Sequence, residues 1–257
     1  MKINVHYSNK HLEELYFTGK TSVVIDVLRA TTVIVTALVN GAREIIPVST
    51  VDFAMKVSGN AFGGQTLLGG ERNTKMIEGF QLGNSPREYK PKVVAGKSII
   101  LYTTNGSRSI VKAKFSENLF TCSFQNLPAV AAHLLTLNKD VEIICAGNNG
   151  SFNMEDAVCA GRLIAELKQP DNPELDDLAR ACLILNKTFG KNLKKMLKES
   201  EHGRLLIENG FIDDLAICAE VGITDVIPSY SSGIIKKLEI ITAADDQPDS
   251  KAGQKSN

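Results

Sequence analysis

Short apolar runs alternate with helical patterns over most of this chain, and that rhythm constrains the fold more than any other feature. Continuous apolar runs bounded by turn residues are typical of strands that are buried on both faces of a parallel sheet. We expect such strands over residues 23–25, 44–48, 65–70, 98–103, 119–123 and 141–147. We expect helices over residues 30–40, 51–58, 125–137 and 156–167. This order predicts an α/β fold with three layers, α/β/α, and a largely parallel sheet.

The pattern changes after Pro170, where the chain becomes charged and rich in helical spacing. We expect helices over 174–200 and 213–220, and then a final pair of strands over 225–228 and 234–241. The chain then divides into an α/β core that carries the main motifs (1–168), a helix-rich second half packed on that core (169–242), and a tail without apolar content that should be disordered (243–257). The segments 40–50 and 221–231 share a glycine, an acid and an Ile-Pro pair, which leaves open two related halves.

Charge and cysteine content exclude several classes of protein. The 29 basic and 29 acidic residues cancel, so no overall positive field draws the chain to nucleic acid or to an anionic membrane. No run of 18 apolar residues occurs, and the first residues lack the apolar core of a secretory signal. The five cysteines form no CxxC pair, so we expect reduced, mostly core cysteines in a cytoplasmic protein. We also expect a homo-oligomer, the common state of such proteins.

Several familiar motifs are missing. No GxGxxG dinucleotide fingerprint, no GxxxxGK[ST] phosphate loop and no HExxH zinc motif occurs. A cysteine phosphatase needs an arginine six positions after its nucleophile, and none of the five cysteines has one. Any bound anion must therefore be held by a local cluster of another kind.

Four of the expected strands end in residues that can carry chemistry. These ends read DVLRATT (26–32), GGER (69–72), TTNGSR (103–108) and GNNGS followed by Glu155 and Asp156 (147–156). An open α/β sheet binds its ligands beyond the carboxyl ends of its strands, so we expect these residues to meet at one edge of the sheet. Taken singly, each stretch could instead be a helix cap or an Asn-Gly turn.

The residue types suggest a division of labour. Carboxylates suit Mg²⁺, which takes one or two of them together with substrate phosphate and water. The candidates are Asp26, Glu71, Glu155 and Asp156. Glycine-rich turns with hydroxyls suit phosphate oxygens, and Arg29 and Arg72 can each fork onto an oxyanion. Together they indicate a Mg²⁺-assisted reaction on a small, multiply anionic phosphorylated molecule.

At these motifs the chain closely resembles the 2-phosphosulfolactate phosphatase family. The resemblance rests on the strand-end motifs above and on GFQLGNSPREY (79–89) and CAGNNGSFNMEDAVCAG (145–161), and it extends more weakly into 200–218. Gln81 stands where the family often has an acid, and Ser109 where a small apolar residue is usual. The resemblance implies a cytosolic, Mg²⁺-dependent hydrolase that converts 2-phospho-3-sulfolactate to 3-sulfolactate and phosphate in coenzyme M biosynthesis. Alternatives are another small phosphorylated hydroxy acid as substrate, or a phosphometabolite-binding module without turnover.

The hypothesis assigns a role to each candidate residue. Asp26, Glu71, Glu155 and Asp156 bind the metal, and Asp26, Arg29 and His202 are the catalytic residues. Substrate binding is assigned to Thr31, Arg72, Asn84, Ser85, Thr103, Thr104, Asn105, Gly106, Asn148 and Gly150. His202 is the candidate proton donor to the leaving alkoxide, with a surface or interface histidine as the alternative. Asp26 could form an aspartyl-phosphate, but Leu28 replaces the second Asp of such enzymes, so we favour attack by a metal-bound water.

Overall fold

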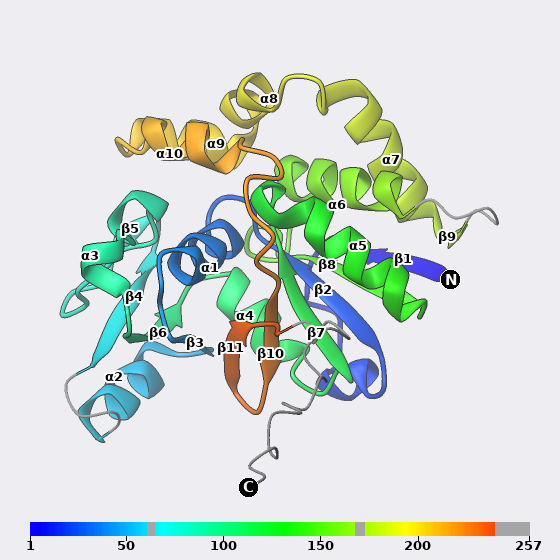
Figure 1. Cartoon of the computed structure of the whole chain (residues 1–257). Helices are drawn as coiled ribbons and strands as arrows, with labels where there is room; N and C mark the ends of the chain where they lie inside the picture. The colour runs from blue at the N-terminus through cyan, green and yellow to red at the C-terminus, as the bar shows by residue number, and fades with distance from the viewer. Residues whose placement is uncertain (61–64, 168–172, 240–257) are drawn as a thin grey trace, which may run out of the picture.

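A single mixed sheet runs through the molecule, and helices cover both of its faces (Figure 1). The computed structural model describes residues 1–60, 65–167 and 173–239. Its strands are β1 (Lys2–His6), β2 (Thr21–Ile25), β3 (Glu44–Val48), β4 (Thr66–Arg72), β5 (Lys75–Met76), β6 (Ser98–Tyr102), β7 (Asn118–Cys122), β8 (Val141–Cys145), β9 (Glu174–Leu175), β10 (Pro228–Ser231) and β11 (Ile234–Lys237). The predicted α/β/α class is confirmed.

Helices connect most of the strands. They are α1 (Ala30–Val39), α2 (Val51–Asn60), α3 (Pro91–Val94), α4 (Gly106–Lys112), α5 (Leu127–Leu137), α6 (Met154–Glu166), α7 (Asp177–Phe189), α8 (Leu193–Glu199), α9 (Glu201–Glu208) and α10 (Ile212–Cys218). None of the helices in the described ranges is long and apolar enough to cross a lipid bilayer. The expected strands and helices of the first half are present within a few residues, whereas β1, α4 and α9 were not foreseen. The tail assigned to 243–257 lies outside the described residues.

The sheet consists of two parallel groups separated by an antiparallel hairpin. Among the described residues, the strand order is β5-β4-β6-β3-β11-β10-β7-β2-β8-β1-β9. Strands β4, β6 and β3 run parallel to one another, as do β7, β2, β8, β1 and β9. Hairpin β10–β11 pairs antiparallel with β7 on one side and with β3 on the other (Figure 1). The two parallel groups therefore run in opposite senses along the sheet.

This topology corrects the expectation that the strand ends meet at one edge of a parallel sheet. The ends of β4 and β6 belong to one group, and those of β2 and β8 belong to the other. Neighbouring strands are rotated by about 20–25°, so the steps from β6 through the hairpin to β2 accumulate roughly 100°. We attribute the convergence of the two sets of ends on one region to this twist.

In the final strand pair, the first strand lies later than the sequence suggested, whereas the second begins at the expected residue 234 and is shorter. The expected strand 225–228 ends where β10 begins, at Pro228, and β11 ends at Lys237, before the expected limit at residue 241. The reason is the two-residue turn between them, because Ser232 and Gly233 both have positive φ angles (51° and 89°). Such a turn matches the twist of a hairpin and sets the strands on either side of it.

The two faces of the sheet follow the alternation of side chains along its strands. In β2, Val23 and Ile25 lie in the hydrophobic cluster that contains α5, α6 and α7, whereas Val24 lies in the cluster that contains α1 and α4. All five cysteines are free and buried, as expected from the sequence. Strands β9, β10 and β11 come from beyond residue 168, so the helix-rich second half shares the sheet of the core.

A charged network lies near the amino ends of β1, β2 and β8, in the larger of the two parallel groups. The carboxylate of Glu142 in β8 accepts hydrogen bonds from Asn4, Tyr16 and Lys20 and lies 2.8 Å from the Nε2 atom of His6. Burial alone would raise the pKa of Glu142, but the hydrogen bonds from His6, Asn4 and Lys20 lower it to about 2. The network thus lies at the opposite end of β2 and β8 from Asp26 and the GNNGS stretch.

Glu142→Gln should lower the free energy of unfolding by about 1–3 kcal/mol at neutral pH, because it removes a charged acceptor from a buried network. The folded-state pKa lies below the ordinary value of 4.5, so this contribution is present above pH 4.5 and is lost as the pH falls towards about 2. Urea denaturation across this range measures the difference between variant and wild type.

The matched control is Glu117→Gln, whose ion pair with Lys139 is exposed. This variant should lower the free energy of unfolding by less than about 1 kcal/mol at any pH. Equal losses in the two variants would contradict the role given to the Glu142 network.

Candidate active site

The loop between β2 and α1 places Asp26 at the centre of the site. Thr31 holds this loop, because its Oγ1 atom donates to the Asp26 carbonyl oxygen (2.8 Å) and accepts from the Asp26 N–H (3.1 Å). Helix α4 begins directly beside the Asp26 carboxylate. A Cβ atom at Gly106 would lie 2.5 Å from Asp26 Oδ2, so only glycine allows this approach. The first turn of α4 and Asp26 therefore form one compact unit.

The carboxylate of Asp156, in the first turn of α6, ties two strand ends together. Its Oδ1 atom accepts from the Val27 N–H (2.9 Å) beyond β2, and its Oδ2 atom accepts from the Gly147 N–H (3.2 Å) beyond β8. Both oxygens are thus occupied by backbone donors. Asp156 fixes the two loops that carry Asp26 and the GNNGS stretch.

Glu71 links the ends of β4 and β6 in the same way, by accepting hydrogen bonds from backbone N–H groups. Its Oε1 atom accepts from the Thr104 N–H (2.8 Å), and its Oε2 atom accepts from the Thr74 N–H (2.9 Å). Gly70 makes this possible, because a Cβ atom there would collide with the carbonyl oxygen of Tyr102 in β6. The GGER and TTNG motifs are therefore bound to each other.

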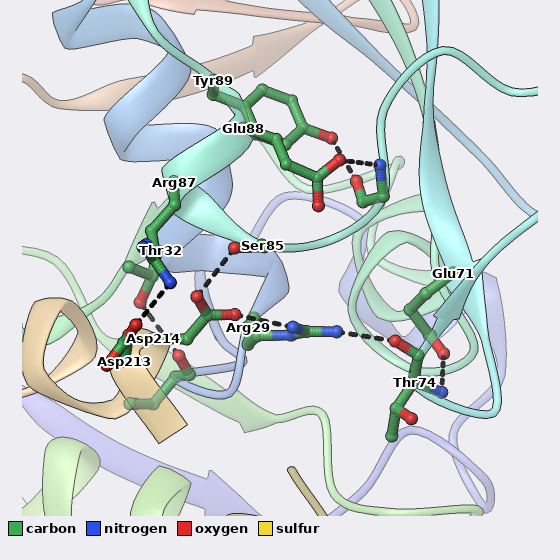
Figure 2. Close-up of polar contacts among 12 residues, drawn as sticks. Arg29, Thr32, Glu71, Thr74, Ser85, Arg87, Glu88, Tyr89, Asp213 and Asp214 are labelled. Atoms are coloured by element: carbon green, nitrogen blue, oxygen red, sulfur yellow. Dashed lines mark hydrogen bonds and ion pairs between the residues drawn. The ribbon is translucent and has the colours of Figure 1, made fainter. Parts of the chain in front are cut away.

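Arg29 is fully buried and joins three distant segments (Figure 2). Its Nη1 atom donates to Asp214 Oδ2 in α10 (2.7 Å), and its Nη2 atom donates to the Thr74 carbonyl oxygen (2.9 Å). The ring of Phe211 lies 4.2 Å from the guanidinium carbon, a cation–π contact. The other Asp214 oxygen accepts from the Ser85 hydroxyl (2.7 Å). These contacts fasten α10 over the strand ends.

The candidate residues surround two adjoining cavities. The inner cavity, about 20 Å³, is lined by Asp26, Leu28, Arg29, Glu71, Thr74, Asn84, Thr103, Asn105 and His202. The outer cavity, about 170 Å³, is lined by Asn9, Lys10, Thr104, Asn105, Arg108, Ala146, Asn149 and Gly150. Asn105 lines both, so the two cavities share a wall. The strand ends from the two parallel groups do meet, as the motifs indicated.

His202, at the start of α9, lies inside this site. Its Nδ1 atom is 3.6 Å from Glu155 Oε1, and neither atom has a hydrogen-bond partner among the described residues. Burial alone would lower the pKa of His202, but the carboxylates of Glu155 and Asp26 raise it above its ordinary value of 6.5. These two carboxylates therefore favour the protonated form of the imidazole.

The acids repel one another. Burial, together with the negative charges of Glu71 and Glu155, raises the pKa of Asp26 to about 6. Burial and the charges of Asp26 and Glu155 also raise the pKa of Asp156 well above its ordinary value. A cation placed among these carboxylates would relieve the repulsion.

Asp26 and Glu155 are the residues that best fit a magnesium ion. Mg²⁺ needs only one or two carboxylates when phosphate oxygens and water complete its shell. Glu155 has a buried oxygen without a hydrogen-bond partner among the described residues, and burial together with nearby acids raises the pKa of Asp26. No set of three or more His, Cys, Asp or Glu side chains within the described ranges is placed to hold a metal by itself.

Some predicted residues lie away from the inner cavity. Arg72 is exposed at the end of β4 and lines neither cavity. The side chain of Asn148 bonds to Asn149, Ser85 bonds to Asp214, and Thr31 bonds to its own loop. Thr104 and Gly150 line the outer cavity instead.

Other residues of the site were missed from the sequence. Thr74 and Asp214 hold Arg29, and Phe211 lies against it. Asp213 and Asp214 open a helix, where acids commonly serve only to complement the helix dipole. Nothing in the local pattern distinguishes the buried Asp214 from the exposed Asp213, which pairs with Arg87 (Figure 2).

Comparisons with known proteins show which sequences this chain is similar to. Residues 6–233 match the family model described as 2-phosphosulpholactate phosphatase. The chain is 44% identical to a probable 2-phosphosulfolactate phosphatase of Caldanaerobacter subterraneus subsp. tengcongensis, over 84% of this chain and 90% of that protein. It is 40% identical to one from Symbiobacterium thermophilum, over 88% and 97% of the two chains. It is 38% identical to one from Clostridium acetobutylicum, over 91% and 100%.

Asp214→Asn should lower the free energy of unfolding by about 3–5 kcal/mol, because it leaves the Arg29 guanidinium buried without a counter-charge. Asp213→Asn is the matched control, since the adjacent Asp213 pairs with Arg87 at the exposed surface. The control should lower the free energy of unfolding by less than about 1 kcal/mol. Urea denaturation measures both, and similar costs for the two variants would contradict the central place given to the buried ion pair.

Proposed function

The chain belongs to the 2-phosphosulfolactate phosphatase family, and we propose that it hydrolyses 2-phospho-3-sulfolactate to 3-sulfolactate and inorganic phosphate. Family membership makes it a phosphoric monoester hydrolase. The observation that carries the proposal is the inner cavity, where Asp26, Arg29 and His202 lie together beside the TTNG turn. A role in coenzyme M biosynthesis is the finer part of the proposal.

We assign the phosphate to the TTNG turn and to Arg29. The side chain of Thr103 is bound to the Ser107 N–H, and the Thr104 N–H is bound to Glu71, so both residues are held rigidly. The Asn105 side chain lies between the two cavities, and the guanidinium of Arg29 supplies positive charge. A rigid, preorganised surface of this kind stabilises charge on a transferring phosphoryl group without further rearrangement.

The metal assignment rests on Asp26 and Glu155. Both carboxylate oxygens of Glu71 and of Asp156 accept hydrogen bonds from backbone N–H groups. We therefore propose that these two residues hold the loops that surround the ion. When bound, Mg²⁺ would neutralise the charge that builds up on the phosphoryl group and on the leaving oxygen.

We assign proton transfer to His202 and Asp26. The carboxylates of Glu155 and Asp26 favour the protonated form of His202, and since Nδ1 faces Glu155, we assign Nε2 as the proton donor to the leaving alkoxide. Asp26 lines the same cavity as His202, and we assign it as the base that accepts a proton from the attacking water. Nucleophilic attack by Asp26 is the alternative, and trapping a phosphorylated Asp26 would establish it.

The test of the proposed function is release of inorganic phosphate from 2-phospho-3-sulfolactate, with Mg²⁺ and then with EDTA. We expect Mg²⁺-dependent release, and weaker release from 2-phospholactate and phosphoglycerate. Release only from other phosphate esters would keep the reaction class and reject the substrate. No release from any ester would favour the non-catalytic binding module.

The Glu155→Gln variant tests whether Glu155 is a ligand of the metal ion. It should raise the Mg²⁺ concentration needed for half-maximal activity, because a carboxylate oxygen is lost from the metal shell. Glu201→Gln, at an exposed position in α9, is the control and should leave that concentration unchanged. An unaltered Mg²⁺ dependence in Glu155→Gln would exclude Glu155 as a ligand.

His202→Gln should lower kcat on 2-phospho-3-sulfolactate by about 10²–10⁴-fold, the usual contribution of a general acid. On p-nitrophenyl phosphate the loss should be much smaller, because nitrophenolate leaves without a proton. Steady-state kinetics on the two substrates make the comparison. Equal losses on both would show that His202 maintains the structure of the site and does not donate the proton.

A further inference from the structure

Asn84 has a buried oxygen atom that the proposed reaction has not used. Its side chain lines the inner cavity, and its Oδ1 atom has no hydrogen-bond partner among the described residues. The Oγ1 atom of Thr74, which lines the same cavity, is likewise buried without a partner in the described part of the chain. Leaving a buried polar atom without a hydrogen bond is costly, so these two atoms indicate a place where a small polar group binds.

The inner cavity has the size of one water molecule. Its volume is about 20 Å³, and a buried water requires roughly 10–15 Å³ together with two to four polar partners. A phosphoryl group, with its oxygen atoms around phosphorus, needs more room than this. The phosphate is assigned to the TTNG turn, whose Asn105 lines both cavities. A water in the inner cavity would therefore lie next to the phosphate.

Glu88 and Tyr89 hold the segment that carries Asn84 (Figure 2). Glu88 Oε2 accepts a hydrogen bond from the Gly83 N–H (2.6 Å), and the Tyr89 hydroxyl donates one to the Gly83 carbonyl oxygen (2.7 Å). Both contacts depend on glycine, because a Cβ atom at Gly83 would lie 2.8 Å from Glu88 Oε1 and one at Gly69 would collide with the Tyr89 hydroxyl. Burial raises the pKa of Tyr89, so its phenol keeps the proton that it donates.

The residues on both sides of Asn84 are also bound to other parts of the site. The Gly70 N–H, in β4, donates to the Gly83 carbonyl oxygen (3.1 Å). On the other side, the Ser85 hydroxyl donates to Asp214 in α10 (2.7 Å). A backbone that is fixed on both sides limits the movement of the Asn84 side chain in the cavity. Such preorganisation is what a group that orients a reactant requires.

We infer that Asn84 orients the water that attacks phosphorus, and that Glu88 is the residue that positions Asn84. The inference rests on the proposed function, because it adds a role within the same reaction. A water in the inner cavity donates one hydrogen bond to Asp26 and one to Asn84 Oδ1, and it accepts one from the Thr74 hydroxyl. These three partners are the usual number for a buried water. The second lone pair of the water remains free to attack.

The bonds and protons of this step balance. The water oxygen forms a bond to phosphorus while the ester P–O bond breaks. One water proton passes to Asp26, and the leaving oxygen takes a proton from His202. The second water proton, which is directed at Asn84 during the attack, stays on the phosphate product. Asn84 thus acts on the water, whereas the sequence suggested that it binds the substrate.

The Asn84→Ala variant tests the orienting role on two substrates. It should lower kcat by about tenfold to a hundredfold on both 2-phospho-3-sulfolactate and p-nitrophenyl phosphate, because water attacks phosphorus in either case. KM should change by less than about threefold on both. A loss that appears in KM for 2-phospho-3-sulfolactate and is absent with p-nitrophenyl phosphate would show that Asn84 binds the substrate, and it would overturn the inference.

Two substitutions of Glu88 test its positioning role. Glu88→Ala should lower kcat by about tenfold without changing KM, because Asn84 is then less firmly held. Glu88→Gln should recover most of this loss, because glutamine keeps an oxygen that accepts from the Gly83 N–H. The matched control is Glu78→Ala, which removes an exposed acid from the same segment between β5 and β6 and should leave kcat unchanged. Equal losses in the two Glu88 variants, or no loss in either, would overturn the positioning role.

A crystal structure at high resolution separates this inference from the proposed substrate. The wild type should show an ordered water between Asn84 Oδ1 and Asp26. The Asn84→Leu variant, which has a side chain of similar size but no acceptor, should lack this water.

An ordered water at that position in a protein that does not hydrolyse 2-phospho-3-sulfolactate would support the orienting role and reject the substrate. Hydrolysis of that ester by a protein without the water would reject the orienting role and keep the proposed function. Neither the water nor hydrolysis in the wild type would reject both.

Discussion

The ion pair between Arg29 and Asp214 joins residues that are 185 positions apart and lies almost entirely out of solvent. Burying two charges is costly, and the cost is offset only when geometry and additional hydrogen bonds are favourable. Here the Thr74 carbonyl oxygen, the Ser85 hydroxyl and the Phe211 ring provide them. The pair holds α10, and with it the helix-rich second half, over the strand ends. The inner cavity exists because this cover is in place.

Carboxylates are concentrated in the inner part of the site, and their charges change the pKa values of the groups around them. Burial and neighbouring carboxylates raise the pKa of Asp26 and of Asp156, and the charges of Glu155 and Asp26 raise the pKa of His202. Asp156 is stabilised by backbone donors, whereas Glu155 keeps an oxygen without a hydrogen-bond partner among the described residues. An inner cavity lined by acids thus adjoins an outer cavity lined by Lys10 and Arg108.

Much of the fold could be predicted because its signals are local. The apolar run of β2, the Asn40-Gly41 pair after α1 and the EIIPV strand each depend on a few neighbouring residues, and each was placed correctly. The hairpin at Ser232-Gly233 is also a local signal, but its first strand was placed three residues too early. The opposite senses of the two parallel groups had no local signal, because strand direction depends on which strands pair across the sheet.

The sequence by itself determined the secondary structure of the core, the chemically rich strand ends and the likeness to a phosphatase family. Those features follow from periodicity, turn chemistry and residue type, which act over a few positions along the chain. Only the tertiary structure decided that Asp214 holds Arg29, that His202 lies beside Glu155, and that Lys10 reaches the cavity next to Arg108. Desolvation and charge pairing are responsible, because they depend on which distant segments exclude water from one another, and spacing along the sequence does not record that.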